Sequence, residues 1–158
     1  MPLRGSGRLA QALGRMPTIA AASDVQFAEV LRWLEREERE SFEGFYCKRD
    51  DLAESQAKGE MFCACSGDYP VAFVTMAVKS VGYIELLEVH PSHRRKGFGR
   101  KLAAHAISQL FFLGAPSISV TCAPRSSESF WRALGFVTPQ GSTQHHHESP
   151  RLTLVHAP

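Results

Sequence analysis

Apolar residues recur along the chain in two rhythms, one typical of helices and one typical of strands. Phe27, Val30 and Leu34 follow Ser23 at helical spacing, and a second amphipathic stretch begins at Gly99. We therefore predict helices over 24–40, 50–58 and 99–113 and a short helix that opens at Ser126. Apolar runs bounded by Gly, Pro and Ser predict strands over 18–22, 61–66, 71–78, 83–89, 117–123, 136–137 and 151–156.

The order of these elements predicts one α/β domain with a mixed sheet and helices on both faces. The two last strands, 136–137 and 151–156, are expected to pair across the loop between them. Residues 1–16 stand apart because they contain arginines and glycines but no acid. We predict a poorly structured N-terminal extension over 1–16, followed by one domain over 17–158. A targeting segment, or a start at Met16, are the alternatives.

Composition narrows the classes of function. The 158 residues carry a net charge of +2, far from the strongly basic balance of many nucleic-acid-binding proteins. No segment approaches the roughly eighteen apolar residues of a membrane span. The four cysteines match no zinc or disulfide pattern, and the three histidines at 145–147 have no Cys or Asp nearby. We therefore expect a cytoplasmic protein with reduced thiols, no metal, and no nucleic-acid or membrane partner.

The most informative stretch joins the strand that ends at Val89 to the helix that begins at Gly99. Arg and Lys are dense over 94–101, and Gly97 lies among them. Glycines let the backbone curl so that several N–H groups point inward, and a helix N-terminus adds partial positive charge. The stretch is therefore predicted to bind an anion such as a phosphate group.

The pattern Arg94-x-x-Gly97-x-Gly99 resembles the Gln/Arg-x-x-Gly-x-Gly/Ala motif of the GNAT superfamily of N-acetyltransferases. Val89-His-Pro91 before it and Phe130-Trp-Arg-Ala-Leu-Gly-Phe136 after it fit the same family. The resemblance covers about 61–137. It implies a single-domain GNAT-like fold whose mostly antiparallel sheet contains a central, splayed pair of parallel strands, 83–89 and 117–123.

The same resemblance implies acetyl-CoA as the cosubstrate and no metal. The backbone amides of 95–100 would cradle its pyrophosphate, and the main chain of Leu87 and Val89 would pair with the pantetheine arm. The amide near Val89 would polarise the thioester carbonyl. The residues that the resemblance assigns to cofactor binding are Leu87, Val89, Arg94, Arg95, Lys96, Gly97, Phe98, Gly99, Arg100 and Trp131.

Two carboxylates are candidates for the base that removes the amine proton, Glu85 and Glu88. They are three residues apart, so a regular strand would place them on opposite faces, with Glu85 on the face of Leu87 and Val89. Glu85 is therefore the first candidate, although both carboxylates would equally suit a solvated or Arg-paired position. Charged residues over 35–40 predict a solvated helix face, the alternative being an acidic rim that attracts a cationic substrate.

The family often protonates the departing thiolate with a Tyr, but this chain has Trp131 there, and an indole is no general acid at neutral pH. Water, Cys122, Ser126 and Tyr83 are the alternatives. Pro124 likewise replaces an Asn that holds the pantetheine in many members.

The leading hypothesis is transfer of an acetyl group to a primary amine of a small molecule, peptide or protein, directly in a ternary complex. The alternative is a catalytically weak or inactive acyl-CoA-binding or regulatory module, which Trp131 and Pro124 favour. A third hypothesis, nucleic-acid binding by the basic stretch, conflicts with the low net charge. The acceptor is expected to contact 33–58 and 139–150, and a homodimer is compatible with the family.

Overall fold

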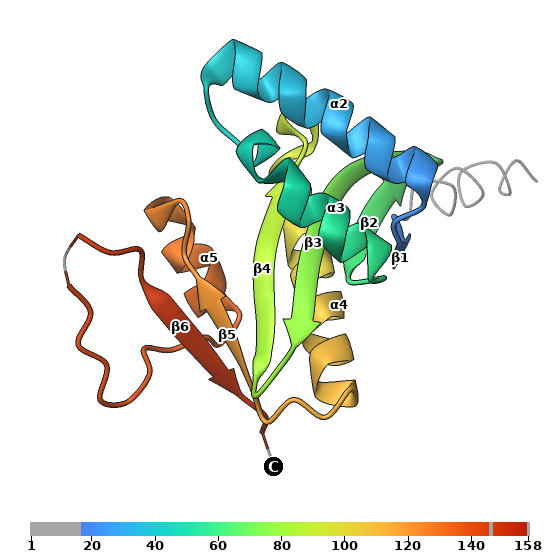
Figure 1. Cartoon of the computed structure of the whole chain (residues 1–158). Helices are drawn as coiled ribbons and strands as arrows, with labels where there is room; N and C mark the ends of the chain where they lie inside the picture. Colours follow the sequence, from blue (N-terminus) through green and yellow to red (C-terminus); the bar gives the residue numbers. More distant parts are fainter. Residues whose placement is uncertain (1–16, 146, 158) are drawn as a thin grey trace, which may run out of the picture.

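A computed structural model describes residues 17–145 and 147–157, so the predicted extension over 1–16 lies outside the described residues. Its six-stranded sheet keeps the order of the chain, and every neighbouring pair is antiparallel except the parallel pair β4–β5 (Figure 1). The predicted mixed sheet is thus confirmed. The strands are β1 (Thr18–Ala21), β2 (Met61–Ser66), β3 (Tyr69–Val78), β4 (Gly82–Val89), β5 (Ser117–Thr121) and β6 (Arg151–Val155).

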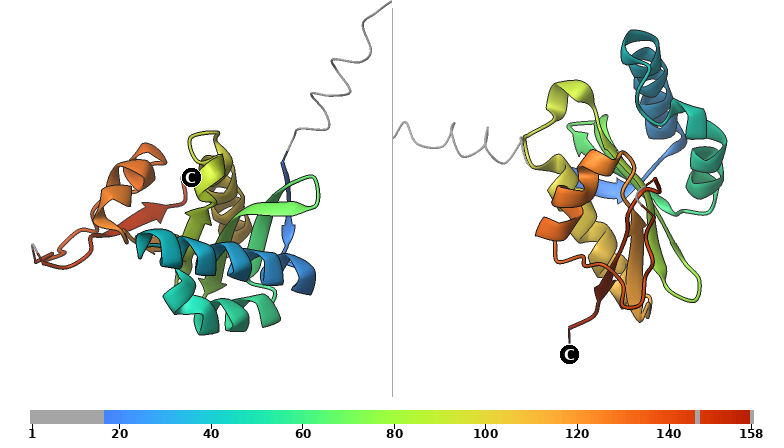
Figure 2. Two further views of the ribbon diagram at one scale, coloured as in Figure 1. Left: turned by 90° about the horizontal axis from the view of Figure 1, so that it is seen from above. Right: turned by 90° about the vertical axis from the view of Figure 1, so that its left-hand side faces the viewer.

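Helices cover both faces of the sheet (Figure 2). Helices α2 (Asp24–Ser41) and α3 (Arg49–Ala57) lie on one face, and α4 (Phe98–Phe112) and α5 (Glu128–Ala133) lie on the other. Short 3₁₀ turns at Tyr46–Lys48, Pro91–His93 and Arg125–Ser127 connect them. Ser23 caps α2 through a capping box with Gln26, as its sequence position predicted. Among the described residues, no helix is long and apolar enough to cross a bilayer.

Each face of the sheet has its own apolar core. The core under α4 contains the helical face predicted from the sequence, with Leu102, Ala103, Ala106 and Leu110 all buried. The core under α2 is built around Val30, Trp33 and Leu34. The indole nitrogen of Trp33 donates a hydrogen bond to the carbonyl oxygen of Pro70 at 3.2 Å, which fixes α2 to the start of β3.

Two details of strand pairing differ from the prediction. Ser66 pairs with Tyr69, so the β2–β3 turn contains only Gly67 and Asp68, and β3 starts earlier than expected. The last strand, β6, pairs along its whole length with β5, while Val137 forms only an isolated bridge to Thr153. The predicted pairing between the two last strands is thus present, but β5 is the main partner of β6.

A bulge in β4 overturns the predicted faces of its two carboxylates. Thr75 pairs with Leu86 and Met76 pairs with Ile84, so Glu85 is the extra residue between them. Leu87 and Val89 therefore pack with Ile84 in the core under α4, whereas Leu86 packs under α2. Glu85 lines a groove with Leu86 and residues of α3, and Glu88 contacts α2. The two carboxylates share one face, because the bulge breaks the regular alternation that the prediction assumed.

Candidate active site

The parallel strands β4 and β5 separate along their length and open a cleft between them. They pair only from Gly82 with Ile118 to Ile84 with Val120, and β4 then continues to Val89 without a strand on that side (Figure 1). The cleft has a volume of about 930 Å³ and is lined by β4, the loop before α4, the end of β5 and α5. The unpaired main chain of β4 offers a place where an extended ligand can add as a strand.

The loop before α4 has the backbone geometry of an anion site. Gly97 is the N-cap of α4 with φ +88°, and Arg95 also has a positive φ of +61°. The first amides of α4, at Phe98, Gly99 and Arg100, have no carbonyl within the helix to pair with, and these three residues line the cleft. A Cβ on Gly99 would lie 3.4 Å from Val89 Cγ2, so a larger residue would narrow the cleft.

The structure brings nearly all predicted site residues together around this cleft. Leu87 and Val89 from β4, Trp131 from α5 and most of the predicted loop residues line it. Both Glu85 and Glu88 line it as well. Lys96 is the exception, because it is exposed on the outside of the loop.

Arg94 is engaged by the protein itself, unlike the other loop cations. Its Nε donates to the carbonyl oxygen of Val89 at 3.0 Å, and its Nη2 donates to Glu37 Oε1 at 2.7 Å. The family resemblance assigned Arg94 to cofactor binding, and this assignment stays a prediction. In the structure the guanidinium of Arg94 bridges the loop, β4 and α2.

Glu37 and Glu88 form a buried pair of carboxyl groups at the α2 side of the cleft. They are only 6% and 8% exposed, and an oxygen of each lies beside the same loop residue, Gly44. The pKa of Glu88 is raised to about 8, first because burial disfavours its charged form and then because of Glu37 nearby. Arg94 and the backbone N–H of Phe45 lower the pKa of Glu88 and so oppose part of this rise.

Gly44, in the loop between α2 and α3, lies directly beside the two carboxyl groups. A Cβ at Gly44 would lie 2.7 Å from Glu37 Oε2 and 2.9 Å from Glu88 Oε1, so any larger residue would push the two carboxyl groups away. Its φ of +89° is also strained for any other residue. The loop therefore packs its backbone directly against the two carboxyl groups.

Glu37 is the site residue that the sequence reasoning missed. The charge run over 35–40 was predicted to be a solvated face, and Glu35 indeed forms an exposed pair with Arg39. Glu37, however, follows Val30 by seven residues and Leu34 by three, so it lies on the buried face of α2. Helical spacing applied to charged residues would have found it.

Glu85 lies where the cleft meets a second groove of about 650 Å³ along α3. The two cavities share Phe45, Glu85, Leu86, Thr121 and Ala123. The side chain of Glu85 is exposed, and Lys58 interacts with it electrostatically. Of the two segments expected to contact the acceptor, 33–58 lines these cavities, whereas no described residue of 139–150 does.

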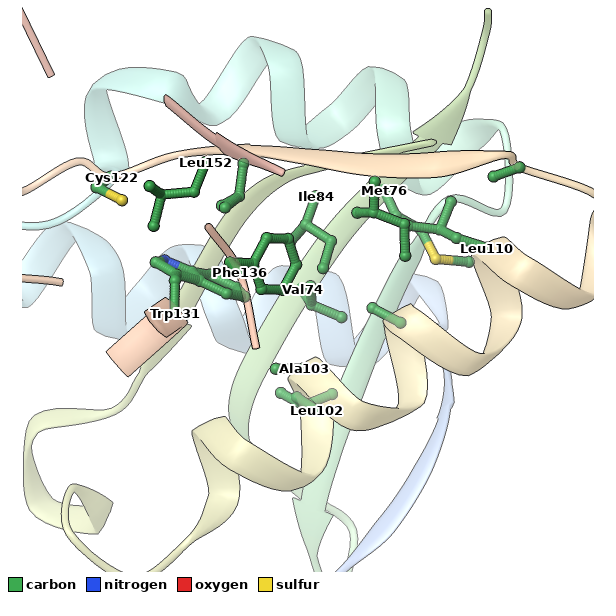
Figure 3. Close-up of a cluster of buried hydrophobic side chains, with 14 of the residues drawn as sticks. Val74, Met76, Ile84, Leu102, Ala103, Leu110, Cys122, Trp131, Phe136 and Leu152 are labelled. Atoms are coloured by element: carbon green, nitrogen blue, oxygen red, sulfur yellow. The ribbon is translucent and has the colours of Figure 1, made fainter. Parts of the chain in front are cut away.

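Trp131 stands in the position of the family's Tyr, and the residues considered as the acid in its place differ in whether they line the cleft. Trp131 is a core residue that packs against Phe136 with ring centroids 5.4 Å apart (Figure 3). Cys122 is fully buried, burial raises the pKa of its thiol, and neither it nor Tyr83 lines the cleft. Ser126 does line the cleft, at its exposed rim.

Comparison with known proteins identifies the family to which this fold belongs. The family model "Acetyltransferase (GNAT) family" matches residues 26–136. A comparison with curated protein sequences found no significant match.

Solved structures resemble the whole fold at low sequence identity. A GNAT acetyltransferase from Brucella melitensis in complex with acetyl-CoA superposes with a TM-score of 0.67 at 16% identity, over 91% of this chain and 90% of that one. The ribosomal-protein-S18-alanine N-acetyltransferase of Escherichia coli gives 0.65 at 17% identity, over 87% and 91%. The PaiA N-acetyltransferase of Thermoplasma acidophilum in complex with coenzyme A gives 0.66 at 12% identity, over 89% and 99%.

The motif, the splayed parallel pair and the match over 26–136 agree with one another, and the predicted resemblance and fold are confirmed. The chain belongs to the GNAT family of acetyltransferases.

Proposed function

We propose that this protein transfers the acetyl group of acetyl-CoA to a primary amine of a small molecule, peptide or protein, directly in a ternary complex. The observation that carries the proposal is the strained loop at the N-terminus of α4, which opens onto the cleft between β4 and β5. Two structural neighbours hold acetyl-CoA or coenzyme A, which supports the same donor here.

The residues around the cleft fit such a donor. The first amides of α4, together with the cations Arg95 and Arg100, suit its pyrophosphate. The main chain of Leu87 and the N–H of Val89 suit the amide groups of a pantetheine arm, whereas the carbonyl oxygen of Val89 accepts from Arg94. Phe98 and Trp131 supply apolar walls. Bound there, acetyl-CoA supplies an activated thioester whose carbonyl the β4 amides can polarise.

Glu85 is the residue that we assign to removal of the amine proton. It lies at the junction of the cleft and the second groove, where a donor and an acceptor entering from α3 would meet. Its exposed side chain can pass the proton to solvent. Holding both reactants at this junction would supply a large part of the acceleration.

A binding module without catalysis remains the second candidate, because Trp131 is a buried core residue in the place of the family's usual acid. Both functions predict donor binding. Only the enzyme releases free thiol when an amine is present.

Thiol release from acetyl-CoA tests the proposal, with n-butylamine, glycinamide and a tripeptide as acceptors. We expect amine-dependent release, and we expect E85Q to slow it by about a hundredfold while acetyl-CoA affinity is unchanged. The matched control is E40Q, which removes an exposed charge of α2 away from the cleft. Tight donor binding without release for any acceptor would favour the binding module, and full activity of E85Q would refute the base assignment.

A further inference from the structure

Glu37 and Glu88 are two buried carboxyl groups that lie close together in the wall of the cleft. Oε2 of each carboxyl group is buried and has no hydrogen-bond donor among the described residues. Two carboxylates are acceptors only, so two buried carboxyl groups side by side favour a proton on one of them. Glu37 Oε1 already accepts from Arg94, which favours the charged form of Glu37 and leaves Glu88 as the group that holds the proton.

Among the described residues, the other groups considered as the acid are poorly suited to protonate a leaving thiolate. Trp131 has no acidic proton, and Cys122 and Tyr83 do not line the cleft. Ser126 does line it, but an alcohol is a much weaker acid than a carboxylic acid. His93 lines it, but burial and Lys96 lower the pKa of this side chain, so the ring is mostly neutral at pH 7. Of the described lining residues, Glu88 is the one that carries an acidic proton at neutral pH.

We propose that Glu88 donates the proton that the departing CoA sulfur requires, and that Glu37 is the positioning residue that keeps this proton on the pair. The inference rests on the proposed function. Glu88 belongs to β4 between Leu87 and Val89, the two residues whose main chain faces the donor slot. Glu88 itself lines the cleft together with Glu37 and Phe45.

The proton balance of the reaction closes with the two carboxylates of β4 in separate roles. The amine nitrogen forms a bond to the acetyl carbon, the carbon–sulfur bond breaks, and its electron pair goes to sulfur. Glu85 takes the proton that the nitrogen loses and releases it to solvent, while Glu88 gives its proton to sulfur. Solvent then returns one proton to Glu88, so amine and acetyl-CoA become acetamide and CoA thiol.

The environments of the two carboxylates support this division. Glu85 is exposed at the bulge, whereas Glu88 is buried against a second carboxyl group. The pKa of about 8 keeps Glu88 mostly protonated at pH 7, which suits an acid and not a base. Two other titratable side chains interact with the pair. Arg94, in the loop, donates to Glu37, and His90, after β4, interacts electrostatically with Glu37.

The pH dependence of E88Q separates an acid from a base. An acid works while protonated, so the ratio of wild-type to E88Q single-turnover rates should be roughly tenfold to a hundredfold near pH 6.5 and fall towards one above pH 8. A base works while ionised, so the same ratio would grow through pH 8. The acceptor's own titration cancels in this ratio. The glutamine side chain has nearly the shape of the glutamic acid side chain, and its amide can donate a hydrogen bond to Glu37. The variant therefore removes the acidic proton with little change in packing.

E37Q tests the positioning role with a readout that simple loss of structure would not move. Removing the negative charge beside Glu88 lowers the pKa of Glu88, so the loss of activity at alkaline pH should begin at a lower pH than in the wild type. E40Q, one turn-length further along α2 and exposed, should match the wild-type profile.

Infrared spectroscopy of the free protein tests the proton on Glu88 without any turnover. We expect a protonated-carboxyl C=O band at pH 7 that disappears in E88Q and persists in E40Q. No such band, or a rate ratio that stays constant or grows with pH in an active wild-type enzyme, overturns this inference and leaves the proposed function standing. A wild-type protein that neither binds acetyl-CoA nor releases thiol overturns both.

Discussion

At the scale of single residues, backbone conformation decides whether the loop before α4 can bind an anion. Gly97 is left-handed with open space around its Cα, so an added methyl group would meet strain and no clash. A non-glycine residue pays about 1–2 kcal/mol in that region. If the loop binds the donor as proposed, relief of this strain would move it out of the binding conformation and reduce the binding-competent fraction.

We therefore expect Gly97→Ala to weaken acetyl-CoA binding about tenfold in calorimetric titration. Gly67 in the β2–β3 turn is a matched control, because it too is left-handed with no atom within 4 Å of an added Cβ. Gly67→Ala should lose a similar amount of stability and bind acetyl-CoA normally. Equal affinities for the two variants would contradict the role of Gly97.

The residues that the sequence could and could not reveal differ in kind. The loop residues were predictable because glycines and cations close together, between a strand and a helix, suit the binding of an anion. The shared face of Glu85 and Glu88 was not, because one extra residue in β4 reverses the alternation and leaves no local signature. The burial of Glu37 was not predicted, because charged residues surround it in the sequence. Its spacing of three residues from Leu34 nevertheless indicates the buried face of the helix.

At the scale of elements, α2 is bound to the site as well as to the core. Trp33 hydrogen-bonds to Pro70 at one point of the helix, and Glu37 joins Arg94 and Glu88 at another. The loop that follows α2 packs on the same carboxyl pair through Gly44. The state of this pair therefore affects how α2 and its loop sit on β4.

Protein stability should follow the proton on Glu88. The folded-state pKa of about 8 lies above the ordinary value of 4.5, so the folded protein binds more protons than the unfolded chain between these values. The stabilisation is full below pH 4.5 and is lost as the pH rises through about 8. We expect the melting temperature to fall from pH 6 to pH 8.5, and to fall less in E88Q. Identical pH dependence in both proteins would show that Glu88 ionises normally.

At the scale of the whole molecule, the candidate site lies where two neighbouring strands of the sheet, β4 and β5, separate. Strands β4 and β5 are neighbours in the middle of the sheet and separate along their length (Figure 1). The cleft lies between them. Element order predicted the mixed sheet, because hydrophobic periodicity and turn residues are local. The width of the cleft and the second groove along α3 were not predictable, since they depend on packing between distant segments.

The central claim is that this cleft binds acetyl-CoA, and calorimetric titration of the full chain with acetyl-CoA tests it most directly. We predict saturable binding at one site per chain, competition by desulfo-CoA, and weaker competition by ADP, which lacks the pantetheine arm. At a ligand concentration of a hundred times Kd, binding should also stabilise the fold by about 2.7 kcal/mol and raise its melting temperature. No heat of binding and no melting shift at millimolar acetyl-CoA would contradict the account.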